Sequence, residues 1–265
     1  MKYFDAENKR LVYIKNAPNE EFWTNHWLHD GNLKQKIEFG SRNGLVKKTT
    51  KKFLGEKSKV IEAGCGIGQN VYGLKQWGYD AYGIDFTKEV IKKSKEHFPN
   101  LNLLVQDARK LSFPDNYFDG YWSLGVIEHF TEGYDLIIRE ARRVLKNGGY
   151  LFLTVPWMSP LRKIKAEMNF YPPFKEGTDM INFYEFMLDE KQVVKHIEAN
   201  GFKLISSNPY DAVKGLKDEI SGLGFFLQKV YNSGNIIIKA FRFLVSIIFA
   251  PFAGHVILLV FKKIR

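Results

Sequence analysis

The sequence lacks the features that mark a secreted protein. It contains a single cysteine, Cys65, so no disulfide can form within the chain, and this cysteine usage is typical of a reducing compartment. The first residues, Met1–Glu7, hold no apolar run of the kind that a secretion signal needs. We therefore expect a cytoplasmic protein.

Acidic residues are scarce relative to basic ones. The chain has 29 Asp and Glu against 39 Lys and Arg, which gives a formal net charge of +10. Such an excess suits nucleic acid, an anionic membrane surface or an acidic substrate. Lysines spread along the chain equally suit an ordinary solvated surface, so the charge alone does not choose among these partners.

A regular alternation of short apolar runs and helical segments occupies residues 59–155. An apolar fraction of 45% over 265 residues is typical of a globular protein. We expect strands at 59–63, 79–85, 101–106, 117–124 and 150–155, with helices at 71–77, 87–97 and 136–145. This order predicts an α/β fold with a doubly wound, mostly parallel sheet, which binds ligands at the carboxyl ends of its strands.

The flanking regions are less regular. Residues 1–55 are polar and rich in aromatic residues, and with helices expected at 20–28 and 45–54 they suggest an N-terminal helical cap before a main domain over 56–265. A helix at 190–199 and strands at 202–208 and 256–261 would complete a seven-stranded sheet. Residues 156–188 and 210–252 are then two insertions that form a lid, the second of them helical and apolar.

The strongest local signal is the glycine-rich turn that follows the first strand, with Gly64, Gly66 and Gly68. Glycines there let a ligand approach the backbone, although a tight turn alone would also use them. Asp85 ends the second strand and Asp107 follows the third. At one sheet edge, Asp85 could accept hydrogen bonds from ribose hydroxyls and Asp107 from the amine of a base, which describes a bound nucleoside.

These motifs resemble those of class I S-adenosylmethionine-dependent methyltransferases. Glu62–Gly68 looks like their first motif, Tyr82–Asp85 their second, 106–119 the stretch beside the adenine, and Arg143–Gly149 the helix end before the fifth strand. The resemblance covers residues 55–155 well and 189–208 loosely. It implies a Rossmann-like fold, S-adenosyl-L-methionine as cofactor, methyl transfer as the reaction, and no metal.

The resemblance also implies roles for particular residues. The three glycines would line the methionine part of the cofactor, with Glu62 supporting that loop or the amino group. The nucleoside would be held by Asp85 at the ribose, Phe86 on the adenine face, Asp107 and Ala108 at the adenine edge, and Leu124 beneath the cofactor. A nicotinamide-linked enzyme is disfavoured, because residue 69 is Gln where that fingerprint has its third glycine.

The end of the fourth strand carries the candidate catalytic residues. The segment Ser123–Phe130 is similar to the Ile/Leu-Glu-His signature of small-molecule and quinone-type methyltransferases. Histidine ordinarily titrates near neutral pH, so His129 is the candidate base for an acceptor hydroxyl, and Glu128 would orient it. The alternative is that Glu128 or His129 caps backbone groups and shapes the loop.

Aromatic residues suggest an apolar acceptor site. Tyr13, Trp23 and Trp27 would close over the cofactor or simply pack on the sheet, and further aromatic side chains would line an acceptor pocket, namely Trp157, Phe170, Tyr171, Phe183 and Tyr184 together with Met158. The segment Asn169–Phe174 is similar to the Asn/Asp-Pro-Pro-aromatic motif of nucleic-acid methylases, but Tyr171 stands where that motif has its polar residue. Nucleic acid is therefore a disfavoured partner.

The carboxyl-terminal part is strongly apolar. Phe243–Phe261 contains no formally charged side chain, but Pro251, Gly254 and His255 interrupt it and argue against a spanning helix. Residues 220–250 would cover the acceptor pocket as a lid, or make peripheral contact with the inner face of the membrane.

Both interpretations of 220–250 favour a hydrophobic acceptor. Together with the resemblance, the sequence predicts methyl transfer to a small or lipid-like hydrophobic acceptor, at oxygen. The alternatives are an RNA methyltransferase and a non-catalytic protein that binds the cofactor or a membrane.

Overall fold

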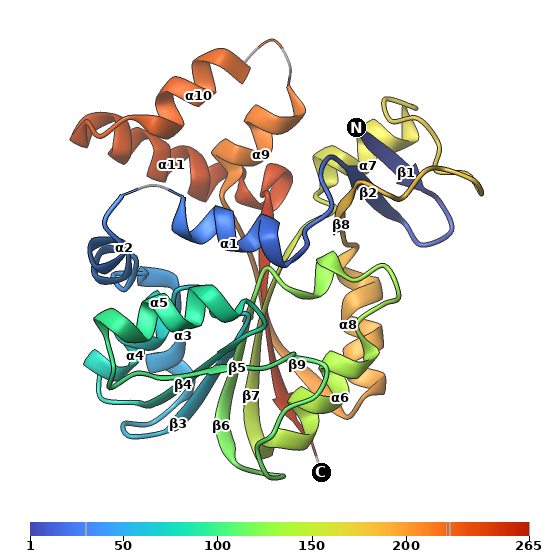
Figure 1. The fold of residues 1–265 in the computed structure, drawn as a ribbon. Helices are drawn as coiled ribbons and strands as arrows, with labels where there is room; N and C mark the ends of the chain where they lie inside the picture. The colour runs from blue at the N-terminus through green and yellow to red at the C-terminus, as the bar shows by residue number, and fades with distance from the viewer. Residues whose placement is uncertain (30, 221, 223, 265) are drawn as a thin grey trace. The chain divides into compact units, whose positions relative to one another are not determined.

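A computed structural model describes residues 1–265 apart from positions 30, 221, 223 and 265 (Figure 1). The chain forms two compact units. The first comprises Met1–Asn16, Thr154–His196 and Ser206–Leu259, and the second comprises Ala17–Leu153, Ile197–Ile205 and Val260–Arg265. The boundaries drawn from the sequence, 1–55 and 56–265, stay a prediction.

The largest sheet has seven strands in the order β5-β4-β3-β6-β7-β10-β9, which confirms the predicted fold class. The strand β3 pairs in parallel with β4 on one side and with β6 on the other. The chain order therefore reverses beside β3, and a sheet of this kind binds its ligand at such a switch point. The strands are β3 (Lys59–Ala63), β4 (Asp80–Asp85), β5 (Asn102–Val105), β6 (Phe118–Leu124), β7 (Leu145–Pro156), β9 (Phe202–Tyr210) and β10 (Val256–Lys263).

All but one of the helices of the second unit agree with the sequence pattern within a few residues. Asparagine side chains cap several of them: Asn19 accepts a hydrogen bond from the Phe22 amide, and Asn43 accepts from the Leu45 and Val46 amides. The helices are α1 (Glu20–Leu28), α2 (Leu33–Gly40), α3 (Gly44–Phe53), α4 (Gln69–Gln76), α5 (Lys88–His97) and α6 (Asp135–Val144), with a 3₁₀ turn at Ile127–His129. The helix α2 was not predicted.

Residues 1–16 differ from the helical cap that the sequence suggested. They form two strands, β1 (Lys2–Asp5) and β2 (Arg10–Ile14), and β2 pairs with β8 (Phe183–Met187) in a separate three-stranded sheet. The predicted insertion over 156–188 contains α7 (Pro160–Glu167) as well as β8. The pairing of β2 with β8 joins segments distant in sequence, and local periodicity does not carry that information.

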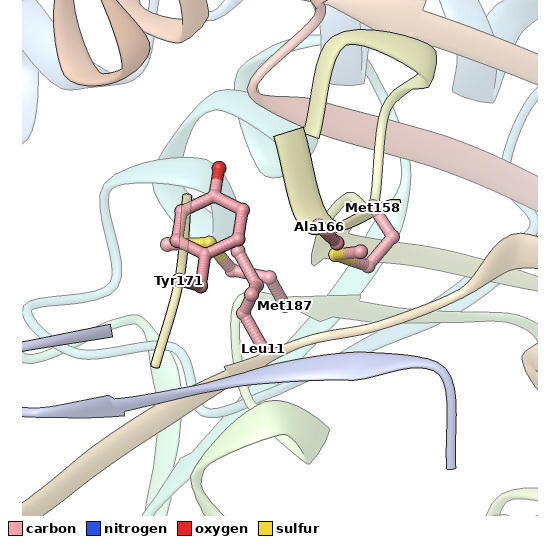
Figure 2. Close-up of a cluster of buried hydrophobic side chains, with 5 residues drawn as sticks. All are labelled: Leu11, Met158, Ala166, Tyr171 and Met187. Carbon is pink, nitrogen blue, oxygen red and sulfur yellow. The ribbon is translucent and has the colours of Figure 1, made fainter. Parts of the chain in front are cut away.

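Two residues of the predicted acceptor pocket lie instead in the core of the first unit. Met158 and Tyr171 pack with Leu11, Ala166 and Met187 in one buried apolar cluster (Figure 2). Phe170, by contrast, is largely exposed. Some aromatic residues of this region are therefore buried in a core and others are exposed, and the sequence pattern could not tell which were which.

A buried ionic cluster joins three segments of the first unit. The Arg162 side chain is fully buried, and its Nε donates to Glu219 Oε1 at 2.9 Å. Glu219 also accepts from Lys2 and Lys165 at 2.6 and 2.8 Å and from the Tyr171 hydroxyl at 2.6 Å. Burial by itself raises the pKa of Glu219, but the nearby cations outweigh burial and lower it to about 2.

The remaining elements of the first unit are helical. They are α8 (Glu190–Ala199), α9 (Ala212–Glu219), α10 (Gly224–Asn232) and α11 (Ile236–Ala253). A small core of Val213, Leu227 and Val230 holds α9 and α10 together, with Ile238 and Val245 of α11 packed against it. The C-terminal insertion is therefore helical, as predicted.

Removing the Glu219 charge should destabilise the protein. We expect Glu219→Gln to cost about 3–5 kcal/mol of unfolding free energy at pH 7, because Arg162 is left buried without its carboxylate. Urea unfolding followed by circular dichroism measures this, with the exposed Glu176→Gln as control. Since the folded pKa lies below the ordinary value, the difference between wild type and variant should shrink as the pH falls from about 4.5 towards 2. A difference that does not change with pH would contradict this role.

Candidate functional site

A cavity of about 390 Å³ lies in the second unit, beside the ends of β3, β4 and β6. Its volume falls within the range of small-molecule sites, roughly 300–1,000 Å³. The walls combine carboxylates, one arginine, exposed backbone and aromatic rings. The lining residues are Pro18, Trp23, Trp27, Gly64, Ile84, Asp85, Phe86, Gln106, Asp107, Ala108, Arg109, Leu124, Gly125, Val126, His129 and Phe130.

Asp85 holds the glycine turn in place. Its Oδ2 accepts a hydrogen bond from the Gly66 amide at 2.8 Å, and its Oδ1 accepts from the Thr87 amide and hydroxyl at 3.0 and 2.7 Å. The carboxylate thus joins the loop after β3 to the start of α5. Each of its oxygens has two lone pairs, so Asp85 keeps accepting capacity for a ligand hydroxyl at the cavity wall.

The glycines of the turn face different neighbours. A Cβ at Gly64 would lie 2.5 Å from the side chain of Val126, and one at Gly66 would lie 2.4 Å from the Trp27 ring. A Cβ at Gly68 would instead meet Leu103 of β5 at 2.9 Å. All three have positive φ angles, which favours glycine. Only Gly64 of the three lines the cavity.

Glu62 lies beneath the turn and is almost fully buried. Its Oε1 accepts from Asn70 Nδ2 at 2.7 Å, which connects the end of β3 to the first turn of α4. Burial, with a smaller contribution from Asp85, raises the pKa of Glu62 to about 8. Its second oxygen, Oε2, has no hydrogen-bond partner among the described residues.

Asp107, the candidate for the adenine edge, already accepts hydrogen bonds within the protein. Arg109 clamps it: the Arg109 amide and Nε donate to Oδ1 at 2.8 and 3.0 Å, and Nη2 donates to Oδ2 at 2.6 Å. These bonds hold the pKa of Asp107 below its usual range. Arg109 also pairs with Glu132 and lies over the Phe130 ring. The adenine of a ligand at this wall would therefore contact the Arg109 guanidinium as well as the Asp107 carboxylate.

Aromatic side chains form much of the rest of the wall. Trp23 and Trp27 lie one helical turn apart on α1, so both point to the same side. The Trp23 ring meets the His129 ring edge-on, with 5.1 Å between ring centroids. The Trp23 ring thus packs against one side of the imidazole, and Glu128, which precedes His129 in the chain, is buried.

The cavity brings together seven of the eleven residues that the sequence singled out. They are Gly64, Asp85, Phe86, Asp107, Ala108, Leu124 and His129. Glu62, Gly66, Gly68 and Glu128 support the surrounding loops without lining the cavity. Arg109 and Phe130 were missed, although an arginine two residues after Asp107 is a visible signal for a local clamp.

These features fit an S-adenosylmethionine-like ligand. The glycine turn offers backbone at Gly64, Asp85 offers carboxylate oxygens for hydroxyl groups, and Phe86 and Ala108 offer apolar surface for a base. The buried Oε2 of Glu62 lacks a donor among the described residues, and a ligand amine near the turn would supply one.

The sequence and the fold are both similar to those of methyltransferases. Residues 61–153 match a family described as "Methyltransferase domain". Phosphoethanolamine N-methyltransferase 3 of Arabidopsis thaliana is 30% identical over 196 residues, which cover 68% of this chain and 39% of that protein. The chain spans only 30 to 42% of the length of this relative and two other curated ones.

Two further comparisons cover nearly the whole of the matched protein. Demethylmenaquinone methyltransferase of Lysinibacillus sphaericus is 24% identical over 81% of this chain and 89% of its own length. A solved SAM-dependent methyltransferase from Archaeoglobus fulgidus has the same fold, with a TM-score of 0.56 and 16% identity over 92% of this chain and all of that one. With the cavity and its glycine turn, these findings show a methyltransferase domain over residues 61–153 and the fold of the class I S-adenosylmethionine-dependent methyltransferases, whose cofactor is S-adenosylmethionine.

Proposed function

We propose that this protein transfers a methyl group to a small or lipid-like hydrophobic acceptor, at an oxygen atom. The observation that carries the proposal is the meeting of three groups around one cavity: the Gly64 backbone, the Asp85 carboxylate and the His129 imidazole. The first two suit the cofactor, and the third offers a base beside it. A hydroxyl needs such a base, because it must lose its proton when its oxygen is methylated.

The residues of the glycine turn and the β4 end would hold the cofactor. When bound, S-adenosylmethionine supplies an electrophilic methyl group carried on a sulfonium. Asp85 would accept from the ribose hydroxyls while it keeps Gly66 and Thr87 in place. Phe86 and Ala108 would pack against the base, with Asp107 and Arg109 at its edge.

His129 would take the proton of the acceptor hydroxyl at its imidazole. Trp23 packs edge-on against this ring, which limits the orientations that the ring can adopt. The buried Glu128 would act through the loop as a positioning residue. The aromatic and aliphatic surface around His129 would exclude water and orient the acceptor, and positioning of this kind contributes much of the rate in transfer reactions.

A hydrophobic acceptor suits the walls beside His129. Trp23, Val126 and Phe130 line this part of the cavity, so an apolar acceptor would gain from burial there. Among the similar proteins, two are named for a menaquinone precursor. We infer that the protein works in the cytoplasm and meets its acceptor at the inner face of the membrane, with peripheral contact through residues 220–250.

Incubation with methyl-labelled cofactor and a cell lysate tests the acceptor class. After partition into lipid, small-molecule, RNA and protein fractions, we expect label in the lipid or small-molecule fraction, as alkali-resistant ether or alkali-labile ester. His129→Gln protein serves as the matched control for label added by other lysate enzymes. Label in RNA alone would replace this acceptor class with RNA, and no label in any fraction would favour a non-catalytic role.

Removing the Asp85 carboxylate should weaken cofactor binding. We expect Asp85→Ala to lower the affinity for S-adenosylhomocysteine at least tenfold, about 1.4 kcal/mol, because the ribose acceptor and the Gly66 bond are lost together. Isothermal titration calorimetry measures this. Asp85→Asn keeps one carbonyl oxygen and should lose less affinity. Unchanged affinity in Asp85→Ala would count against the nucleoside site.

Removing the imidazole should slow the reaction without affecting cofactor affinity. We expect His129→Gln to lower kcat by about 10²–10⁴, the usual contribution of a general base, while S-adenosylhomocysteine binds as in wild type. The exposed His97→Gln is the control and should retain full activity. A kcat equal to that of wild type would show that His129 shapes the loop only.

A further inference from the structure

Helices α10 and α11 carry an unusual surface of exposed apolar side chains. We define this apolar surface by its members, each between 42 and 78% exposed: Phe225, Phe226, Ile236, Ile237, Phe241, Phe243, Leu244, Ile247, Ile248, Phe249 and Phe252. The two helices pack against each other within the first unit, as Figure 1 also shows. Contiguous apolar surface on this scale marks an interaction site.

The burial pattern of α11 is the reverse of that expected for a helix on the surface of a soluble protein. Its protein-facing stripe includes Arg242 and Ser246, which are partly buried, and the small residues Ala250 and Ala253, which are buried. Most of the large apolar side chains occupy the outward positions, and Ile238 and Val245 are the exceptions that pack on the protein side. The helix is also long and apolar enough to cross a membrane, yet only 11% of it is buried in the protein. A core helix would bury its large apolar residues, so packing within the chain does not explain this pattern.

The charges on this part of the chain have one sign. Residues 220–265 contain no Asp or Glu, whereas Lys229, Lys239 and Arg242 lie on α10 and α11. Lys229 and Lys239 are exposed, and the Lys229 ammonium lies 4.3 Å from the centre of the Phe225 ring. Cations beside apolar side chains suit an anionic lipid interface, where the apolar groups enter the acyl region and the lysines reach phosphates.

The packing of α11 favours a helix that lies in the membrane plane. Arg242 donates to the Tyr231 carbonyl of α10, and Ile238 and Val245 pack on the small core shared with α9. One side of α11 is thus covered by protein along its length. Pro251 lies inside its last turn, and β10, a strand of the seven-stranded sheet, begins three residues after the helix ends. A spanning helix would have to give up these contacts.

We propose that α10 and α11 insert side by side into the surface of an anionic lipid bilayer. A second copy of this chain fits the surface less well, because self-association would bring Lys229 and Lys239 towards cations of the same kind. The proposal rests on these two helices and does not depend on the acceptor or on catalysis. It would keep the protein at the membrane surface, where a lipid-like acceptor is concentrated.

Vesicle flotation tests the proposal with the full chain. We expect binding to vesicles of phosphatidylcholine with about 30% phosphatidylglycerol, at least tenfold weaker binding to phosphatidylcholine alone, and weakening with salt. The triple variant Phe243→Ser, Ile247→Ser and Ile248→Ser should lose binding at least tenfold. A control with three exposed apolar residues changed elsewhere, Phe39→Ser, Met168→Ser and Ile181→Ser, should bind as wild type does.

A charge variant separates the two contributions. Lys229→Gln with Lys239→Gln should weaken binding to anionic vesicles several-fold and leave binding to neutral vesicles unchanged. Calorimetry with S-adenosylhomocysteine checks that every variant is folded, independently of any methyl transfer.

Three outcomes would overturn the proposal. The first is vesicle binding by the serine variant equal to that of wild type. The second is a dimer in sedimentation experiments without lipid that the serine variant abolishes. The third is membrane attachment that resists alkaline carbonate, which would indicate a spanning helix.

Discussion

The site depends on the hydrogen bond from the Gly66 amide to the Asp85 carboxylate. The two residues lie in different loops, one after β3 and one at the end of β4, and the 2.8 Å bond fixes the spacing between them. A hydrogen bond to a charged group contributes roughly 1.5–3 kcal/mol, enough to hold a glycine-rich loop that has little intrinsic order. Thr87 fixes the orientation of the same carboxylate, because its amide and its hydroxyl both donate to it. The carboxylate proposed to bind ribose is thus also the one that shapes the turn.

The first unit buries charged side chains and exposes large apolar ones, which is the reverse of the usual distribution. Its interior contains Arg162 and Glu219, fully or nearly fully buried and paired with each other, while the large side chains of α11 face outward. A buried ion pair costs desolvation and is retained only when it is well satisfied, as Glu219 is by four donors. For exposed Phe and Ile side chains, nothing in water offsets the free-energy cost of their apolar surface. Contact with a lipid surface would remove that cost.

Local patterns predicted the second unit well and the first unit poorly. The strands β3, β4 and β6 are largely buried runs, rich in apolar residues, that end at or just before a glycine or an aspartate, so the strands and their ends are both visible in the sequence. The strands β1, β2 and β8 are short and have no such pattern. In this sheet Leu11 and Val12 of β2 pair with Met187 and Phe186 of β8, residues more than 170 positions away. No local propensity encodes a partner at that distance.

The sequence by itself determined the parallel sheet, the glycine turn and the presence of carboxylates at the strand ends, because each depends on residues close together in the chain. Only the tertiary structure decided that Arg109 clamps Asp107, that Trp27 covers Gly66, and that Tyr171 belongs to the core and not to an open pocket. It also decided which face of α11 is exposed, since an apolar helix with an all-round pattern does not specify its buried side. The reason is physical: hydrogen-bond partners and burial are set by side chains that meet only after the chain has folded.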